Sequence, residues 1–101
     1  MSFIDDLKTV IRKVHGVEST HLKSILVTET FHGQTIWDGI VEVFQLHSHP
    51  KTDTAYAWSY ATDDQANPIR HTTVLHLGPV TSAETAVRVA ILQEFRANAE
   101  A

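Results

Sequence analysis

The chain has 101 residues and a formal net charge of −4. Its length fits one domain that builds its own apolar core. Its eight Lys and Arg residues are scattered along the chain and outnumbered by 12 acidic residues, which disfavours binding to nucleic acid or to an anionic membrane surface, because both need clustered positive charge. The chain has no cysteine, which excludes disulfides, thiol catalysis and thiolate metal ligands.

The first predicted element is an amphipathic helix over Ser2–His15, with Ser2 as its N-cap and Gly16 in the left-handed conformation that often ends a helix. Apolar residues at helical spacing form one stripe along it, namely Phe3, Ile4, Leu7, Val10, Ile11 and Val14. The chain start lacks the basic and apolar regions of a secretion signal, and no apolar run reaches bilayer-spanning length. We therefore expect a cytoplasmic protein.

Four β-strands are predicted next, over His21–Phe31, Gln34–Leu46, Thr54–Thr62 and Arg70–Leu77. His32 and Gly33 suit a two-residue hairpin turn, because glycine there permits a positive φ. In the register set by that turn, Lys23 faces Glu42, Ile25 faces Ile40 and Thr28 faces Trp37. A bulge at Gly39 would shift every pairing beyond it.

Neither face of the predicted sheet is polar throughout, which is typical of a sheet that is covered on both sides. The first hairpin places Leu22, Leu26, Trp37, Val41 and Val43 on one face, and Ile25, Val27, Ile36, Ile40, Phe44 and Leu46 on the other. In the third strand Ala55, Ala57, Ser59 and Ala61 share one face, and Tyr56, Trp58 and Tyr60 share the other. The small residues would admit a helix, and the aromatic row is either core or a contact surface.

Gly78 and Pro79 end the fourth strand, and a second helix is predicted over Ala83–Ala97, with Thr81 and Glu84 as a capping box. The element order is then α-β-β-β-β-α, an α+β fold in a single domain over residues 1–101. Short connections favour a four-stranded antiparallel meander with two helices on one face.

With both helices on one face, the other apolar face needs a cover, and a second copy of the chain is the simplest one. We therefore expect a homo-oligomer, with a dimer as the first choice. The predicted interface consists of Tyr56, Trp58, Tyr60, Ile40 and Phe44.

Histidine is unusually frequent, with seven in the chain, and a meander brings His21, His47, His49 and His76 to one edge of the sheet. A metal site would use His47, His49 and His76, with His21 or Asp53 as a further ligand. The same rim could instead be a pH-sensitive contact, or a set of surface histidines without a special role.

Acid–base catalysis would need a histidine beside a carboxylate, and His49 with Asp53 or His71 with Asp63 or Asp64 would supply such a pair. No nucleophile elbow, phosphate loop or metalloprotease motif is present, and no motif calls for a cofactor. These observations favour a protein that is not an enzyme.

Four segments carry a resemblance to a known group of proteins: Trp37–Phe44, His49–Lys51, Tyr56–Trp58 and Thr73–Val80, the last followed by the predicted helix. Spanning residues 22–96, they resemble small bacterial proteins of no known activity, a kind that also occurs as orphan reading frames in mobile gene cassettes. The resemblance implies a bacterial, stand-alone domain and carries over no catalytic residue.

The residues favour a non-enzymatic, homo-oligomeric binding module that uses an apolar sheet face. The alternative is a protein that binds a small molecule or metal, or an enzyme, with its site between helix and sheet or at the histidine rim.

Overall fold

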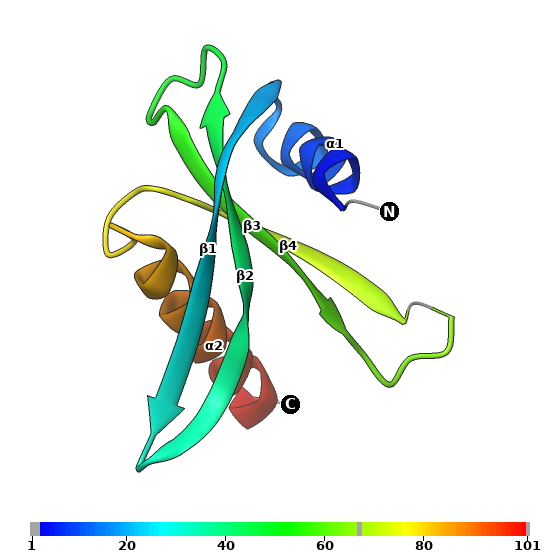
Figure 1. The fold of residues 1–101 in the computed structure, drawn as a ribbon, viewed down its shortest axis with the longest axis vertical. Coiled ribbons are helices and arrows are strands. Elements are labelled where there is room, and N and C mark those ends of the chain that lie inside the picture. The colour runs from blue at the N-terminus through cyan, green and yellow to red at the C-terminus, as the bar shows by residue number, and fades with distance from the viewer. Residues whose placement is uncertain (1–2, 67, 101) are drawn as a thin grey trace.

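A computed structural model describes residues 3–66 and 68–100 of the chain. Its elements are α1 (Ile4–His15), β1 (Ser19–Phe31), β2 (Gln34–Leu46), β3 (Thr54–Ala61), β4 (Ile69–Leu75) and α2 (Ala83–Glu100). The strands form one antiparallel sheet in the order β1-β2-β3-β4 (Figure 1). The predicted α-β-β-β-β-α order and the meander are confirmed. Within the described residues, no helix has the length and apolar character needed to cross a membrane.

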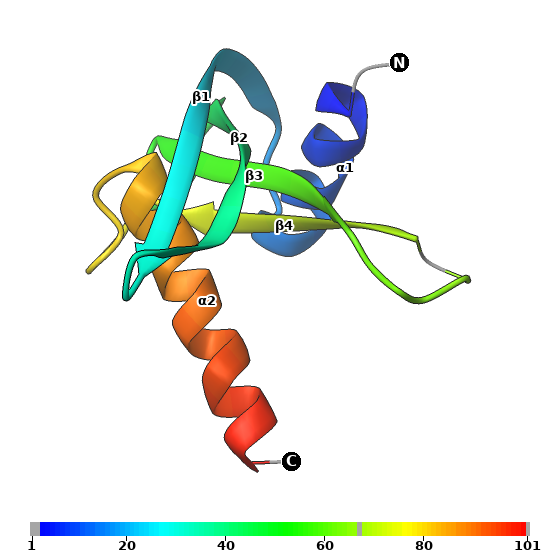
Figure 2. The same ribbon diagram turned by 60° about the horizontal axis from the view of Figure 1, so that its bottom comes forward.

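The two helices pack on opposite faces of the sheet (Figure 2), so the expectation that both cover one face is wrong. Helix α1 buries Leu7 and Ile11 in one core cluster with Phe44, Leu46, Ala55 and Ala57. Helix α2 buries Ala83, Ala86 and Val87 in a second cluster with Val27, Val41, Val43, Tyr56 and Trp58. Because alternate residues of a strand point to opposite faces, the small residues of β3 lie under α1 and its aromatic residues under α2.

A bulge changes the register of the first hairpin. Near the turn Thr30 pairs with Thr35, but Glu29 pairs with Trp37, so Ile36 is the extra residue rather than Gly39. Beyond it the predicted pairings are wrong by one position: Lys23 faces Val43, Ile25 faces Val41 and Thr28 faces Asp38. A shift of one residue turns each side chain of β1 to the other face, which places Val27 under α2 and Leu26 on the α1 side.

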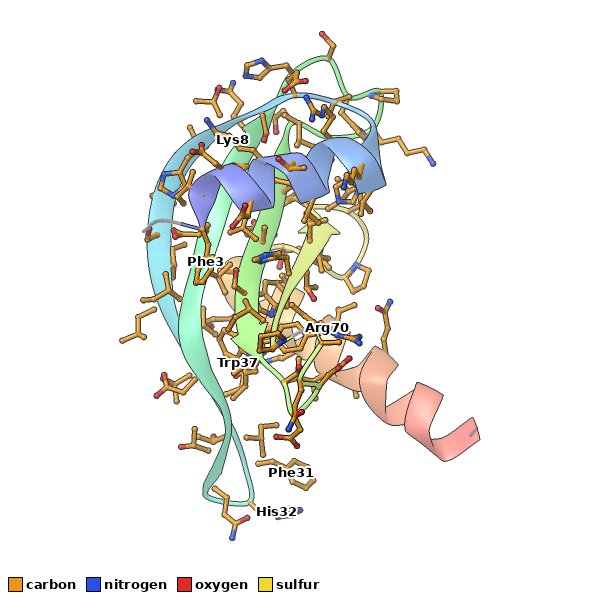
Figure 3. The ribbon with its side chains drawn as sticks, turned by 90° about the vertical axis from the view of Figure 1, so that its right-hand side faces the viewer. Phe3, Lys8, Phe31, His32, Trp37 and Arg70 are labelled. Atoms are coloured by element: carbon orange, nitrogen blue, oxygen red, sulfur yellow. The ribbon has the colours of Figure 1, made fainter. Side chains whose placement is uncertain are left out.

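Strands β2 and β3 pair over a short stretch only, with Glu42–Gln45 opposite Thr54–Ala57. Beyond this stretch the β1–β2 hairpin and the β3–β4 hairpin diverge (Figure 1). Figure 3 shows Phe31 and His32 at the free tip of the first hairpin, far from Phe3, which precedes α1, and from Lys8 of α1. The sheet therefore consists of a short junction with two arms.

Local signals place the turns and caps. Gly16 ends α1 with a φ of 77°, as predicted, and its N–H donates to the Arg12 carbonyl. His32 and Gly33 have φ values of 52° and 77°, which fit a type I′ hairpin turn. Ser2, the predicted N-cap of α1, lies outside the described residues.

The N-cap of α2 is Ser82, one residue later than predicted. The Ser82 hydroxyl accepts the Thr85 N–H at 3.2 Å, and the Thr85 hydroxyl accepts the Ser82 N–H at 2.8 Å. This reciprocal pair is a capping box built on Thr85 instead of Glu84.

Candidate functional site

Three of the five predicted interface residues belong to the core of the single chain. Phe44, Tyr56 and Trp58 are 0%, 5% and 3% exposed, because α1 covers Phe44 and α2 covers Tyr56 and Trp58. The expectation that they form a subunit contact is therefore wrong. Tyr60 is half-buried, and Ile40 is 50% exposed.

Exposed apolar residues gather on the β1–β2 hairpin. Leu26 and Ile40 are cross-strand partners on the α1 side of the sheet, and Leu22 is the extra residue of a second bulge in this hairpin, on β1. Their exposed fractions are 69%, 50% and 53%, respectively. We call these three residues the ribbon patch.

Polar pairs lie on both sides of Leu26 and Ile40, and one of them separates these two residues from Leu22. On one side the Thr28 hydroxyl donates to the Asp38 carboxylate at 3.2 Å, and on the other the Ser24 hydroxyl donates to Glu42. His21 Nε2 lies 3.1 Å from the same Glu42 carboxylate. An apolar centre with a polar rim is the usual anatomy of a protein–protein contact.

The histidines of the predicted metal site have separate partners. His47 Nε2 lies 2.7 Å from the Thr20 hydroxyl, and His76 Nδ1 lies 2.7 Å from the Tyr56 hydroxyl. His49 Nδ1 accepts the Lys51 N–H at 3.1 Å. Among the side chains that the structure describes, in residues 3–66 and 68–93, no group of three or more His, Asp or Glu could hold a metal ion. The geometry lends the metal site no support.

Two histidines on the α1 side of the sheet contact hydroxyl groups. His71 Nδ1 lies 2.7 Å from the Ser59 hydroxyl, and His15 Nε2 lies 3.2 Å from the Thr73 hydroxyl. Burial lowers the pKa of His15, and the neighbouring charge of His49 lowers it further. The Ser59–His71 pair was not predicted. Ser59 and His71 are cross-strand partners on β3 and β4, so the correct register of these two strands would have placed them together.

A cleft of about 570 Å³ opens between α2 and the β3–β4 arm, and we call it the helix cleft. It is lined by Trp37, Trp58, Tyr60, Ala61, Thr72, Thr73, Val74, Val87, Ala90, Ile91 and Gln93. It contains two members of the predicted aromatic row and both tryptophans of the chain. The aromatic row was expected to be core or a protein contact. Its place in a cleft wall depends on how the two hairpins diverge.

An ion pair ties α2 to β1 beside this cleft. Arg88 of α2 donates from Nε to the Glu29 carboxylate, which is 7% exposed. Both residues line a second hollow, of about 790 Å³, that shares Ile91 with the helix cleft. The position of α2 over the sheet therefore depends on this pair as well as on apolar packing.

Comparisons of the chain with protein-family models, with curated proteins and with solved structures each find no match. What the chain does therefore has to be inferred from its own residues.

Proposed function

We propose that this chain is a non-enzymatic binding module that forms a homodimer through the ribbon patch. The observation that carries the proposal is the exposure of Leu26, which is 69% despite a central position on a 13-residue strand. Leu26 lies beside Ile40, whose side chain is half exposed, so two large apolar residues adjoin on an ordered surface. Contiguous apolar surface of this kind marks interaction sites on soluble proteins.

A second copy of the chain is the occupant that fits best. Helix α1 covers the part of its face around Phe44 and Ala55 and leaves the β1–β2 part open. Two such surfaces, related by a two-fold axis, would bring Leu26 and Ile40 of one copy onto those of the other, as in face-to-face sheet packing. The polar pairs beside the patch would then form the rim.

The expected affinity follows from the size of the patch. Three large apolar side chains make a contact smaller than the roughly 800 Å² per partner of a standard interface. We therefore expect a reversible dimer with a dissociation constant on the order of micromolar, rather than an obligate one.

Sedimentation or light scattering over a range of concentrations tests this proposal. Wild-type protein should approach twice the mass of one chain, and Leu26→Lys should raise the dissociation constant by at least about tenfold, because it would bury an unpaired charge at the contact. Gln45→Lys adds the same charge at an exposed position of β2 outside the patch and should leave the dimer intact.

Both variants should keep the thermal stability of the wild type, because Leu26 and Gln45 are exposed in the single chain. A wild-type protein that stays monomeric at about 100 µM, well above the expected constant, would overturn the proposal. If Leu26→Lys and Gln45→Lys weaken dimerisation equally, the contact does not lie at the ribbon patch.

A further inference from the structure

We infer that the helix cleft binds a small, uncharged aromatic compound with a hydrogen-bonding edge. Its volume of about 570 Å³ lies within the roughly 300–1,000 Å³ that is typical of small-molecule sites. Such sites combine apolar walls with a few convergent polar groups, and the helix cleft has both.

Aromatic rings form one wall of the cleft. The rings of Trp37 and Trp58 meet edge to face, with centroids 6.0 Å apart and an interplanar angle of 73°. Gly39 makes room for this arrangement, because a Cβ there would lie 3.1 Å from the Trp37 ring. Val87, Ala90 and Ile91 of α2 supply further apolar lining, so the cleft offers aromatic and aliphatic surface to a flat ring system.

Two hydroxyl groups give the cleft its polar character. Tyr60 and Thr72 lie on adjacent strands of the face that carries Trp58, since Trp58 pairs with Thr72 and Tyr60 with Arg70. Within the described part of the chain, neither hydroxyl has a hydrogen-bond partner. Each is therefore able to bond a polar edge of a bound molecule, and would do so without breaking a contact inside the protein.

The residues that line the helix cleft also favour an uncharged ligand. None of the described residues that line the helix cleft is charged at neutral pH. Two ion pairs lie nearby, and each is neutral as a unit. Glu29 with Arg88 lines the adjoining hollow, and Arg70, the cross-strand partner of Tyr60, lies 3.8 Å from the Asp64 carboxylate. A charged ligand would lose its hydration without gaining a partner, which costs several kcal/mol, whereas a neutral one avoids this cost.

A matched pair of fluorescent probes tests both the site and the charge. N-phenyl-1-naphthylamine is neutral and aromatic and has one N–H, and 8-anilino-1-naphthalenesulfonate has the same rings with a negative charge. The neutral probe should bind and accept energy from Trp37 and Trp58, the only two tryptophans of the chain. The anionic probe should bind at least about tenfold more weakly.

Variants locate the probe. Ala90→Phe fills the cleft from α2 and should weaken binding of the neutral probe at least about tenfold, whereas Ala66→Phe in the exposed β3–β4 loop should leave binding unchanged. Tyr60→Phe removes one hydroxyl and keeps the aromatic ring in the wall, and should weaken binding several-fold. This second variant keeps the test valid if Ala90→Phe fails to fold.

The dimer proposal and the cleft can fail separately. Leu26→Lys should bind the neutral probe as the wild type does, because the ribbon patch and the cleft lie on opposite sides of the sheet. Loss of probe binding in Leu26→Lys would place the probe on the ribbon patch and overturn the cleft. The same conclusion follows if Tyr60→Phe and a folded Ala90→Phe bind normally, if the anionic probe binds as tightly, or if no binding occurs.

Discussion

Histidine side chains contribute to this molecule mainly as hydrogen-bond partners of hydroxyl groups. In the described residues, the bonded pairs are His15 with Thr73, His47 with Thr20, His71 with Ser59 and His76 with Tyr56. Each pair joins residues that are at least 12 positions apart in the chain. Burial also raises the pKa of Tyr56, so its phenol stays neutral at ordinary pH and can donate a hydrogen bond to the His76 ring.

His15 makes the stability of the protein depend on pH. Its pKa is lowered from 6.5 in the folded protein, first by burial and then by His49. The unfolded chain therefore binds more protons than the folded one below about pH 6.5, and the free energy of unfolding falls as the pH drops toward the folded pKa. Above pH 6.5 this contribution is complete.

Replacing His15 tests this linkage by urea denaturation at about pH 7.5 and about pH 5.0. His15→Gln keeps a hydrogen-bonding group near Thr73 but does not titrate, so it should lose less stability between the two pH values than the wild type does. His32→Asn is the control, because His32 is exposed at the hairpin tip and asparagine tolerates its positive φ. If the free energy of unfolding of His15→Gln depends on pH as strongly as that of the wild type, His15 is not the source of this pH dependence.

At the scale of elements, helix α2 depends on the Glu29–Arg88 pair. Arg88→Ala should lower the free energy of unfolding by about 1–3 kcal/mol, because it leaves the buried Glu29 carboxylate without its partner. The double variant Glu29→Gln with Arg88→Ala should recover part of that loss, since a neutral amide is cheaper to bury than a charge. Urea denaturation of the three proteins gives both differences. Equal stability of Arg88→Ala and the wild type would show that packing alone holds α2.

Most elements were predictable from local chemistry. Helical periodicity gave α1, alternation gave the strands, and the glycines at 16 and 33 gave a helix end and a hairpin turn. The bulge at Ile36 had no such signal, because an apolar residue in an apolar run looks the same whether or not it is paired. That single extra residue decided which side chains of β1 are buried.

The placement of the helices was harder to predict because both faces of β3 suit a helix. Ala55 and Ala57 allow a close approach, and Tyr56 and Trp58 offer a large apolar area. Alternation shows that the two faces differ, but it does not say which helix takes which face. The helix cleft could not be located either, since it depends on how the two hairpins diverge.

At the scale of the whole molecule, the short β2–β3 junction holds the parts together. Residues Glu42–Gln45 and Thr54–Ala57 are the stretch where the two hairpins pair. Both helices meet this stretch, α1 at Phe44 and Ala55 and α2 at Val43 and Tyr56. The ribbon patch lies on one arm, and the helix cleft lies beside the other.

Hydrogen exchange of backbone amides should therefore differ between the junction and the tip of the first hairpin. Amides of the junction lie under two layers of apolar packing and should open only on global unfolding, whereas those near Phe31–Thr35 at the hairpin tip should exchange by local fraying. Dimer formation through Leu26 would slow exchange along the middle of the first arm as concentration rises, and Leu26→Lys should remove that effect. A tip as protected as the junction, in a monomeric sample, would contradict the expectation that the centre of the sheet is more stable than the end of its first arm.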